Sequence, residues 1–441
     1  MDAPDQRLGL FPRPASVKKR AGTRHSQKIG GAGAEPSAAL CFSRAAMTEA
    51  PGRLRDVLCL DFGAGEGACL SDTRFGTAGV SDSTLLGISG AVRARIVFVI
   101  TIVTLAVCTS ASATPAKVGY PNSIAATGDS ITRAFNTGTI PFTDAPGNSW
   151  STGTRSTVAS HYTRILSANP LIYGRRYNNA RSGARMVDLA GQVTTVVSEK
   201  VEYVTILMGA NDVCRSSEAA ITSVSDFRTQ FRSAIATVTR GLPDARVYVT
   251  SIPDVHRLWS VLKDSYWARL AWRTFGICQS MLANPRSTAQ ADVDRRARVR
   301  QREIDFNTQL AQVCAQYVHC RFDGNAVFNT AFTGSDVSTR DYFHPSIAGQ
   351  TKLASVSWSA GFDFTDVIAP LTAATSTPIA TGTLVSLSAT DNVAVAGIEY
   401  RVGSGTYRRY TAPVAVASGT MLTYRAVDVN GNIEASHSFV G

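Results

Sequence analysis

Short apolar runs alternate along the chain with segments in which apolar residues recur every three or four positions. The runs at residues 204–208 and 247–250 are β-branched and largely apolar, which is typical of strands that are buried on both faces of a sheet. Between them, Phe227, Phe231 and Ile235 recur at the spacing of one helix face. Strands that are separated by helices predict parallel pairing with right-handed crossovers. The predicted strands span residues 123–127, 176–179, 201–208, 246–252 and 319–322.

The pattern changes toward the carboxyl end. A stretch with Pro370, Pro378 and many small residues is typical of a linker. Apolar and polar positions then alternate as in half-buried strands, and Asn430-Gly431 is a strong hairpin signal. We therefore predict that residues 366–441 form a linker and a small all-β, immunoglobulin-like sandwich.

The amino-terminal part has a different character. Residues 1–90 lack sustained periodicity and are rich in Gly, Ala, Ser and Arg, so we expect them to be disordered. Residues 91–113 have a basic start, an uncharged apolar run and a final Ala-Ser-Ala, which predicts a signal peptide with cleavage after Ala113. An uncleaved anchor is the competing interpretation, although a spanning helix needs about 20 apolar residues. Since such a signal lies far from the first residue, one hypothesis is that translation starts downstream, at Val80 or Val92, and that the extension is mis-assigned.

Composition and charge bound the remaining possibilities. A chain of 441 residues that is 44% hydrophobic and 17% charged predicts two or three globular domains. We assign residues 114–365 to one α/β domain. The net charge of +11 raises the possibility of a nucleic-acid partner. The basic residues concentrate at 294–302, without aromatic residues or a recognition motif, so we interpret them as the solvated face of a helix and expect no nucleic acid.

Four of the eight cysteines follow the predicted cleavage point. An even number in an exported chain predicts disulfides, and four cysteines allow three connectivities. We favour a local Cys314–Cys320 bridge and a long-range Cys214–Cys278 bridge. Metal binding is the alternative, but the spacing contains no CxxC pair, so we expect no metal site.

A serine follows the first predicted strand, in Gly128-Asp129-Ser130, and the pattern after it can enter a helix. Such a turn lies at the carboxyl edge of the sheet, where open α/β sheets bind ligands. A serine hydroxyl is a poor nucleophile unless a base removes its proton. By itself the tripeptide is weak evidence, because small turn-forming residues occur together in many loops.

A candidate base is His344. It has a carboxylate three residues earlier, Asp341, and a predicted helix directly after it. The carboxylate can accept the Nδ1 proton and leave Nε2 free to take a proton from Ser130. The alternative is an ordinary helix start with polar neighbours. His437 has Glu434 at the same spacing but lies in the β-rich part.

Two further strand ends carry candidate donors for an oxyanion. Asn211 follows a buried strand and can direct its amide over the sheet edge, while Gly183 can present its N–H because it has no side chain. With the N–H of Ser130, these groups would stabilise a tetrahedral intermediate. Each also has an alternative as an ordinary turn at a strand end.

Four blocks in this order resemble those of the SGNH hydrolases, also called GDSL esterases/lipases. They are Gly128-Asp129-Ser130, Gly183, Gly209-Ala210-Asn211-Asp212 and Asp341-x-x-His344. The resemblance covers roughly residues 120–360 and implies a flavodoxin-like three-layer α/β/α fold and ester hydrolysis without a cofactor or metal. The first block continues with Ile131 in place of the Leu of the family's older name. Residues 148–154 and 203–207 look closest to the secreted bacterial and phospholipase-B-like branches.

The resemblance implies a secreted serine ester hydrolase, a lipase or esterase, in which Ser130, His344 and Asp341 act through an acyl-enzyme. One alternative is a carbohydrate acetyl esterase whose β-module contacts polysaccharide or a cell surface. Another is a surface-binding protein without catalysis. We expect a monomer. The aromatic-rich residues 253–271 suit a lid, or an apolar wall for an acyl chain or for the face of a sugar ring. They suit equally a helical pair that packs on the core.

Overall fold

The computed structural model describes residues 118–441. The predicted extension at 1–90, the predicted signal peptide at 91–113 and the four cysteines that precede the predicted cleavage point lie outside the described residues. Within residues 118–441, no helix combines the length and the apolar character that crossing a membrane requires.

A parallel five-stranded sheet forms the centre of the α/β domain. Its order, β2-β1-β3-β4-β5, is that of flavodoxin-like folds. Every residue of β1, β3 and β4 is buried, as expected for strands that are covered on both faces. The predicted α/β fold is thus confirmed, and each predicted strand overlaps an observed one. The strands are β1 (Ile124–Gly128), β2 (Arg176–Asn178), β3 (Tyr203–Leu207), β4 (Arg246–Val249) and β5 (Cys320–Phe322).

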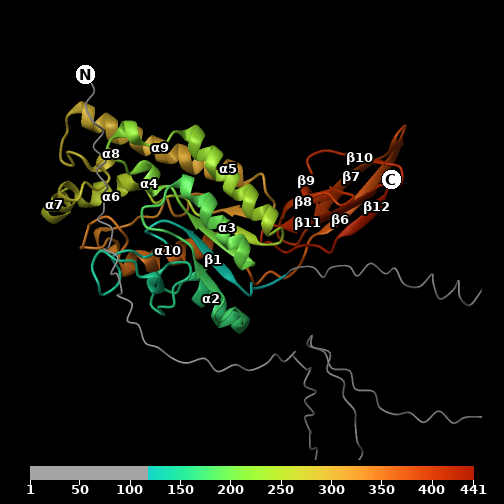
Figure 1. Cartoon of the computed structure of the whole chain (residues 1–441), viewed down its shortest axis with the longest axis horizontal. Helices are drawn as coiled ribbons and strands as arrows, with labels where there is room; N and C mark the ends of the chain where they lie inside the picture. The colour runs from blue at the N-terminus through green and yellow to red at the C-terminus, as the bar shows by residue number, and fades with distance from the viewer. Residues whose placement is uncertain (1–117) are drawn as a thin grey trace, which may run out of the picture. The chain divides into compact units, whose positions relative to one another are not determined.

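Helices cover both faces of this sheet, with α3, α5 and α9 on one side and α2 and α10 on the other (Figure 1). Phe231 and Leu310 belong to the core under the first group, and Tyr162 and Tyr248 to the core on the opposite face. The helices on these two faces are α2 (His161–Ala168), α3 (Leu189–Glu199), α5 (Val224–Gly241), α9 (Gln290–Cys314) and α10 (Ile347–Ala360). The other α-helices of the described residues are α4 (Ala210–Val213), α6 (Val255–Leu262), α7 (Tyr266–Thr274) and α8 (Gln279–Leu282). Short 3-10 helices cover Pro146–Asn148, Pro170–Ile172, Met186–Asp188, Glu218–Ala220 and Gly334–Asp336.

The prediction that a helix starts directly after Ser130 is wrong. A single turn follows the serine, in which the Arg133 N–H donates to the Asp129 carbonyl at 3.1 Å. Ala134 and Asn136 then adopt left-handed backbone conformations, with φ of 49° and 63°. An α-helix of L-residues cannot continue through such positions, and the next α-helix begins at His161.

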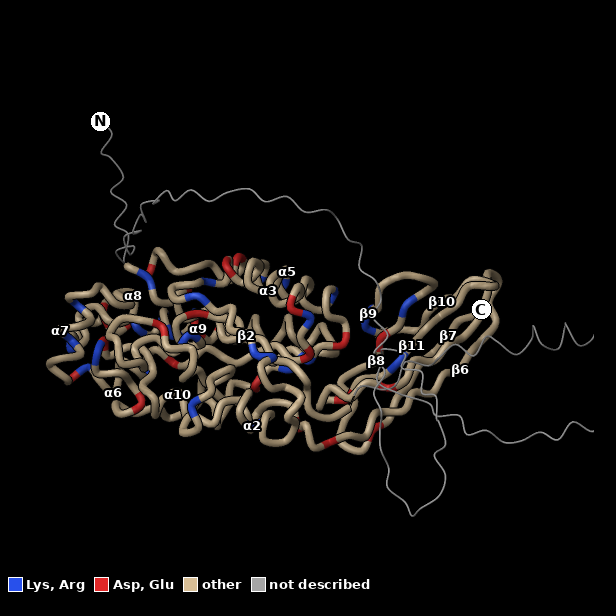
Figure 2. The backbone as a smooth tube through the Cα atoms, turned by 60° about the horizontal axis from the view of Figure 1, so that its bottom comes forward, with Lys and Arg blue, Asp and Glu red and all other residues tan. Residues whose placement is uncertain are grey.

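The interpretation of residues 294–302 as a solvated helix face is only partly right. Lys and Arg are interspersed with Asp and Glu along the described chain (Figure 2). On α9, however, Arg296 is only 4% exposed and donates to the Ser287 carbonyl. Arg295 donates to the carbonyls of Ser280 and Ala283. These arginines therefore fasten the chain around α8 to α9, because a planar guanidinium can reach several carbonyls at once.

Two antiparallel sheets form the carboxyl-terminal module. Their orders are β10-β7-β6 and β12-β11-β8-β9, and Val385, Ile398 and Leu422 belong to the core between them. The two-sheet module agrees with the predicted all-β domain, and its immunoglobulin-like character stays a prediction. The strands are β6 (Leu371–Ile379), β7 (Gly382–Thr390), β8 (Val395–Val402), β9 (Arg408–Arg409), β10 (Val414–Ala417), β11 (Met421–Asp428) and β12 (His437–Val440).

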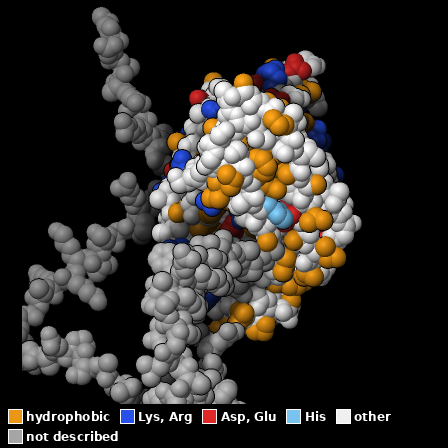
Figure 3. Space-filling view, turned by 90° about the vertical axis from the view of Figure 1, so that its right-hand side faces the viewer, with side chains coloured by type: hydrophobic (Ala, Val, Ile, Leu, Met, Phe, Trp, Pro, Cys, Tyr) orange, Lys and Arg blue, Asp and Glu red, His pale blue; other side chains and the backbone are white. Residues whose placement is uncertain are grey.

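The predicted linker proves to be largely a strand. β6 pairs with β7 from Leu371 to Ile379 and lies at the edge of its sheet. Between Leu371 and Pro378 it consists of small and hydroxyl-bearing residues that are mostly exposed, so no apolar alternation marks it in the sequence. Pro378 is tolerated because an edge strand leaves one row of N–H groups unpaired. Figure 3 shows one face of the described residues, on which hydrophobic side chains outnumber charged ones.

Candidate active site

Three of the predicted site residues meet at the carboxyl edge of the sheet. His344 Nε2 lies 2.8 Å from Ser130 Oγ, and its Nδ1 lies 2.7 Å from Asp341 Oδ2. Ser130 follows β1 directly, whereas Asp341 and His344 lie in the loop before α10. The imidazole therefore links the carboxylate and the hydroxyl when Nδ1 donates and Nε2 accepts.

The loop before α10 holds the carboxylate firmly. Asp341 Oδ1 accepts the backbone N–H groups of Phe343 and His344 at 3.0 and 3.1 Å. Ser346 then caps α10 by accepting the Gly349 N–H, which starts the helix directly after His344. Burial opposes ionisation of Asp341, but the hydrogen bond and charge of His344 and these two N–H groups lower its pKa. The carboxylate is therefore charged at neutral pH and can stabilise an imidazolium.

Backbone geometry and two glutamines position the turn that carries Ser130. Gly128 has φ of 145°, and a Cβ there would lie 2.3 Å from the Leu207 carbonyl oxygen, so only glycine fits. Gln192 accepts from the Gly128 N–H at 2.7 Å and donates to its carbonyl at 2.9 Å. Gln350 donates to the Ile131 carbonyl at 2.8 Å. Sequence reasoning missed both glutamines, because they lie on distant helices and no local pattern distinguishes them.

The candidate oxyanion donors surround the same turn. Asn211 lines the cleft beside Ser130 and His344, and its Nδ2 donates one hydrogen to the Ala184 carbonyl at 3.0 Å, which leaves the second hydrogen available. Gly183 has φ of 79° and open space where a Cβ would be, although it is not among the residues that line the cleft. Within residues 118–441, the N–H groups of Ser130 and Gly183 donate to no protein acceptor.

Two neighbouring carboxyls support the turns. Asp212 accepts the Met186 N–H at 2.8 Å and the Thr222 hydroxyl at 2.7 Å. Asp129 is fully buried beside Ser130; its Oδ1 accepts the Ile131 N–H, while Oδ2 has no hydrogen-bond partner in the described chain. Burial raises the pKa of Asp129 to about 7, since a low-dielectric interior disfavours the charged form.

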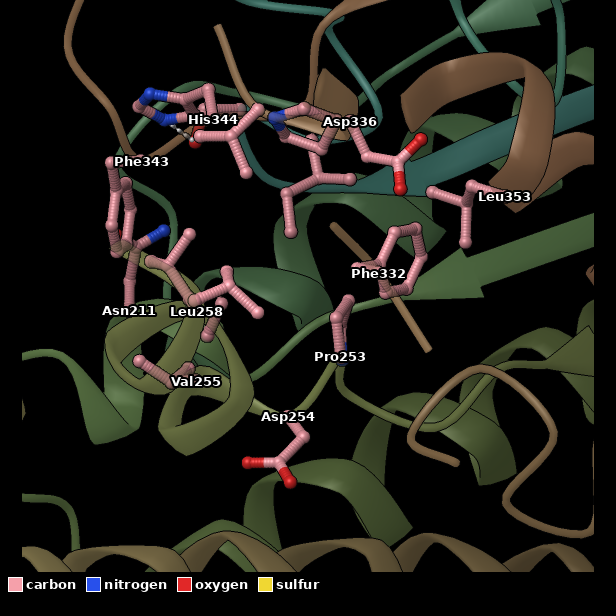
Figure 4. A pocket seen from close by; sticks show the side chains of 16 residues that line it. Asn211, Pro253, Asp254, Val255, Leu258, Phe332, Asp336, Phe343, His344 and Leu353 are labelled. Carbon is pink, nitrogen blue, oxygen red and sulfur yellow. Dashed lines mark hydrogen bonds between the residues drawn. The ribbon is translucent and has the colours of Figure 1, made fainter. Parts of the chain in front are cut away.

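An apolar cleft opens beside Ser130. His344, Phe343 and Asn211 lie on one side, and Phe332 and Leu353 lie on the other (Figure 4). The helix α6 supplies one wall. The apolar lining of the cleft consists of Ile131, Ala210, Pro253, Val255, Leu258, Val261, Phe332, Val337, Phe343, Pro345 and Leu353.

The aromatic connection after β4 is both a wall of this cleft and a helical pair. Leu258 and Val261 of α6 line the cleft, while Trp272 of α7 is buried and donates its indole N–H to the Tyr342 carbonyl at 2.9 Å. Trp267 is 63% exposed and contributes to neither. The two interpretations of the sequence are therefore compatible, because different helices serve each.

Two disulfides fasten the surrounding loops. Cys214, at the end of α4, is bonded to Cys278, just before α8. Cys314 is bonded to Cys320 between α9 and β5. This is the connectivity that the sequence favoured. The first bridge joins the turn that carries Asn211 to the aromatic connection.

One group of carboxylates within residues 118–441 is close enough to hold a cation. Oxygens of Asp366, Asp391 and Asp428 lie within 4.8 Å of one another. They lie in the carboxyl-terminal region, and Asn430 and Asn432 donate to Asp366 and Asp428. Protein amides thus already donate to the carboxylate oxygens of Asp366 and Asp428, so the cluster gives no reason to place an ion.

Comparisons with known proteins identify the family of the chain. The sequence model of the family described as "GDSL-like Lipase/Acylhydrolase" matches residues 124–356, more than half of the chain. No curated protein matches. Similar solved structures include an extracellular lipase from Streptomyces rimosus, with 19% identity, a TM-score of 0.35 and coverage of 54% of this chain and 99% of that chain. The acetyl xylan esterase AlAXEase has 15% identity, a TM-score of 0.29 and coverage of 54% and 98%. A family 3 carbohydrate esterase from Clostridium thermocellum has 12% identity, a TM-score of 0.31 and coverage of 55% and 94%.

Proposed function

The chain belongs to the GDSL-like lipase/acylhydrolase family and is an ester hydrolase, and we propose that it cleaves carboxylic esters through Ser130, His344 and Asp341. The observation that carries the proposal is the continuous hydrogen-bonded sequence from Asp341 through His344 to Ser130. It supplies what a serine nucleophile needs: a base within reach and a carboxylate that orients the base.

In the proposed reaction, Ser130 Oγ attacks the acyl carbonyl carbon while His344 Nε2 takes the hydroxyl proton. Asp341 stabilises the imidazolium that results. The N–H groups of Ser130 and Gly183 and the free Nδ2 hydrogen of Asn211 donate to the carbonyl oxygen as it becomes negative. The bond to the alcohol oxygen then breaks, and His344 protonates the departing alkoxide. Water hydrolyses the acyl-enzyme by the same route and returns the proton to Ser130.

The cleft supports a substrate with an apolar acyl group. Most of its lining is apolar, as at Leu258 and Phe332, and its two carboxylates, Asp254 and Asp336, form ion pairs with Arg300 and Lys352. Burying an acyl chain against the apolar part gains about 0.8 kcal/mol per methylene. We therefore place lipid or other acyl esters first. A polysaccharide acetyl ester is the second candidate, since an acetyl group would fill only the part of the cleft beside Ser130.

We further propose that the protein is secreted. Two disulfides in the described chain suit an oxidising compartment, where such bonds persist. In this proposal, the catalytic domain spans residues 114–365 and the module of residues 366–441 contacts a cell surface or polysaccharide.

A panel of p-nitrophenyl esters from acetate to palmitate, with acetylated xylan beside it, tests the proposal. We expect hydrolysis of medium or long esters by the wild type, and a kcat at least about 10⁴-fold lower for Ser130→Ala, because the nucleophile is lost. Ser167→Ala, an exposed serine at the end of α2, is the matched control and keeps full activity.

The other outcomes separate the alternatives. Release of acetate from xylan, with activity on p-nitrophenyl acetate alone, would favour the carbohydrate esterase. If no ester turned over and a serine-reactive phosphonate left Ser130 unlabelled, the catalytic proposal would fail in favour of a binding protein.

A further inference from the structure

A buried asparagine contacts the carboxylate of the proposed triad from a separate loop. Asn136 is 4% exposed, and its Nδ2 donates to Asp341 Oδ2. The same oxygen accepts from His344 Nδ1. Because Oδ1 already accepts two backbone N–H groups, the donors on Oδ2 determine how the carboxylate is turned toward the imidazole.

Asn136 is itself held at both ends. Its Oδ1 accepts the Phe142 N–H at 2.6 Å, and its own N–H donates to the Thr143 carbonyl at 3.0 Å. Its φ of 63° is left-handed, a conformation that asparagine tolerates better than most residues. The amide therefore has one orientation, with the nitrogen toward Asp341 and the oxygen toward the loop.

We propose that Asn136 is a positioning residue for ester hydrolysis, which fixes the Asp341 carboxylate and through it the ring of His344. The inference rests on the proposed roles of Asp341, His344 and Ser130. As a neutral donor, the amide orients the carboxylate without removing the negative charge that stabilises the imidazolium. A cation in this place would weaken that stabilisation, and an acceptor would repel the carboxylate.

The same side chain connects the triad to the protein surface. Phe142, whose N–H Asn136 binds, is 50% exposed, and its ring meets the ring of Phe275 at 5.6 Å. Phe275 caps the end of α7, in the aromatic connection that also supplies the cleft wall. A displacement of Phe142 or Phe275 would therefore shift Asp341 through the side-chain amide of Asn136.

Two substitutions test the role. Asn136→Ala removes the donor, and we expect kcat for p-nitrophenyl acetate to fall about 10–100-fold with KM within about threefold, because a small misplacement of the base slows the chemical step. Asn148→Ala is the control, since Asn148 supports the same loop through Thr137 without contacting Asp341. We expect its kcat to stay within about twofold of the wild type.

Asn136→Asp separates positioning from a merely structural role. A second carboxyl against Asp341 holds a proton at low pH and can donate it as the amide does, since two adjacent carboxylates raise the pKa of one of them. We expect the ratio of variant to wild-type kcat to fall at least about tenfold between pH 6 and pH 9, at an unchanged circular dichroism spectrum. A purely structural role predicts a constant ratio.

The inference is overturned if Asn136→Ala and Asn136→Asp, both folded, keep the wild-type kcat at every pH while Ser130→Ala is inactive. A Ser130→Ala variant that stays active would instead overturn the proposed function itself, so the two failures are distinguishable.

Discussion

A second buried histidine shows how burial alone can determine the charge of a residue. His161, at the start of α2, is fully buried, and its ring nitrogens contact the Tyr203 hydroxyl at 2.9 Å and the Ser357 hydroxyl at 2.8 Å. Burial, with a smaller contribution from Arg164, lowers its pKa to about 3. His161 is therefore neutral in the folded protein and joins α2, β3 and α10 by neutral hydrogen bonds.

This shift makes stability dependent on pH. The ordinary pKa of 6.5 applies in the unfolded chain and about 3 in the folded one, so between these values the unfolded state binds more protons. Stability then falls as the pH decreases through this window. At pH 4.5 the loss from this residue is about 2–3 kcal/mol, at about 1.4 kcal/mol for each pKa unit.

His161→Gln should remove that loss, because glutamine keeps a donor and an acceptor but does not titrate. We expect the variant to lose about 2–3 kcal/mol less than the wild type between pH 7.5 and pH 4.5, as measured by urea unfolding at both values. Equal losses in the two proteins would show that His161 becomes protonated without cost.

At the scale of elements, the sequence predicts what repeats locally. The buried strands β3 and β4 appear as β-branched runs, and α5 appears as a row of apolar residues at helical spacing. β6 was not predicted, because an exposed edge strand of mostly small residues has no alternating pattern. The turn after Ser130 was not predicted, because nothing about an alanine indicates the left-handed conformation that Ala134 adopts.

The site residues also separate into those that the local sequence predicts and those that it does not. Ser130, Asp341 and His344 were found because spacing and strand ends mark them, and the structure brings their side chains together. Gln192 and Asn136 were missed because their significance depends on partners 64 and 205 positions away. Tertiary contacts of this kind leave no trace in the local pattern of a single sequence.

The wall that α6 contributes should control acyl chain length. Leu258→Trp fills the cleft beside Val261, so a long acyl chain loses its apolar contacts while an acetyl group still fits. We expect the ratio of kcat/KM for octanoate over acetate to fall about 10–100-fold, which is the loss of about 1.4–2.7 kcal/mol of binding. Leu270→Trp on α7, outside the cleft, is the control. An unchanged ratio for Leu258→Trp would place the acyl group elsewhere.

At the scale of the whole described chain, the module contacts the catalytic domain at the amino-terminal ends of the parallel strands. The site lies at their carboxyl-terminal ends. Arg246 is the first residue of β4, whereas Ser130 follows the last residue of β1, and the strands of the sheet are parallel. Arg246 donates to the carbonyls of Asn430 and Gly119 at 2.8 Å and to the Asn432 side chain at 3.1 Å. Accordingly, no residue of the module lines the cleft.

This arrangement predicts that docking and turnover are separable. Arg246→Met keeps much of the buried volume but removes all three hydrogen bonds, and we expect a loss of stability on the order of 3 kcal/mol, because buried acceptors are left unpaired. Cleavage by thermolysin, which cuts before apolar residues, should become faster in the connection between α10 and β6 as the module loosens. The kcat for a soluble ester should stay within about twofold, since the triad lies at the opposite ends of the strands.

Arg408→Met, at an exposed residue of β9, is the control and should change neither the stability nor the kcat. A large loss of kcat in folded Arg246→Met would instead mean that the module contributes to the geometry of the site.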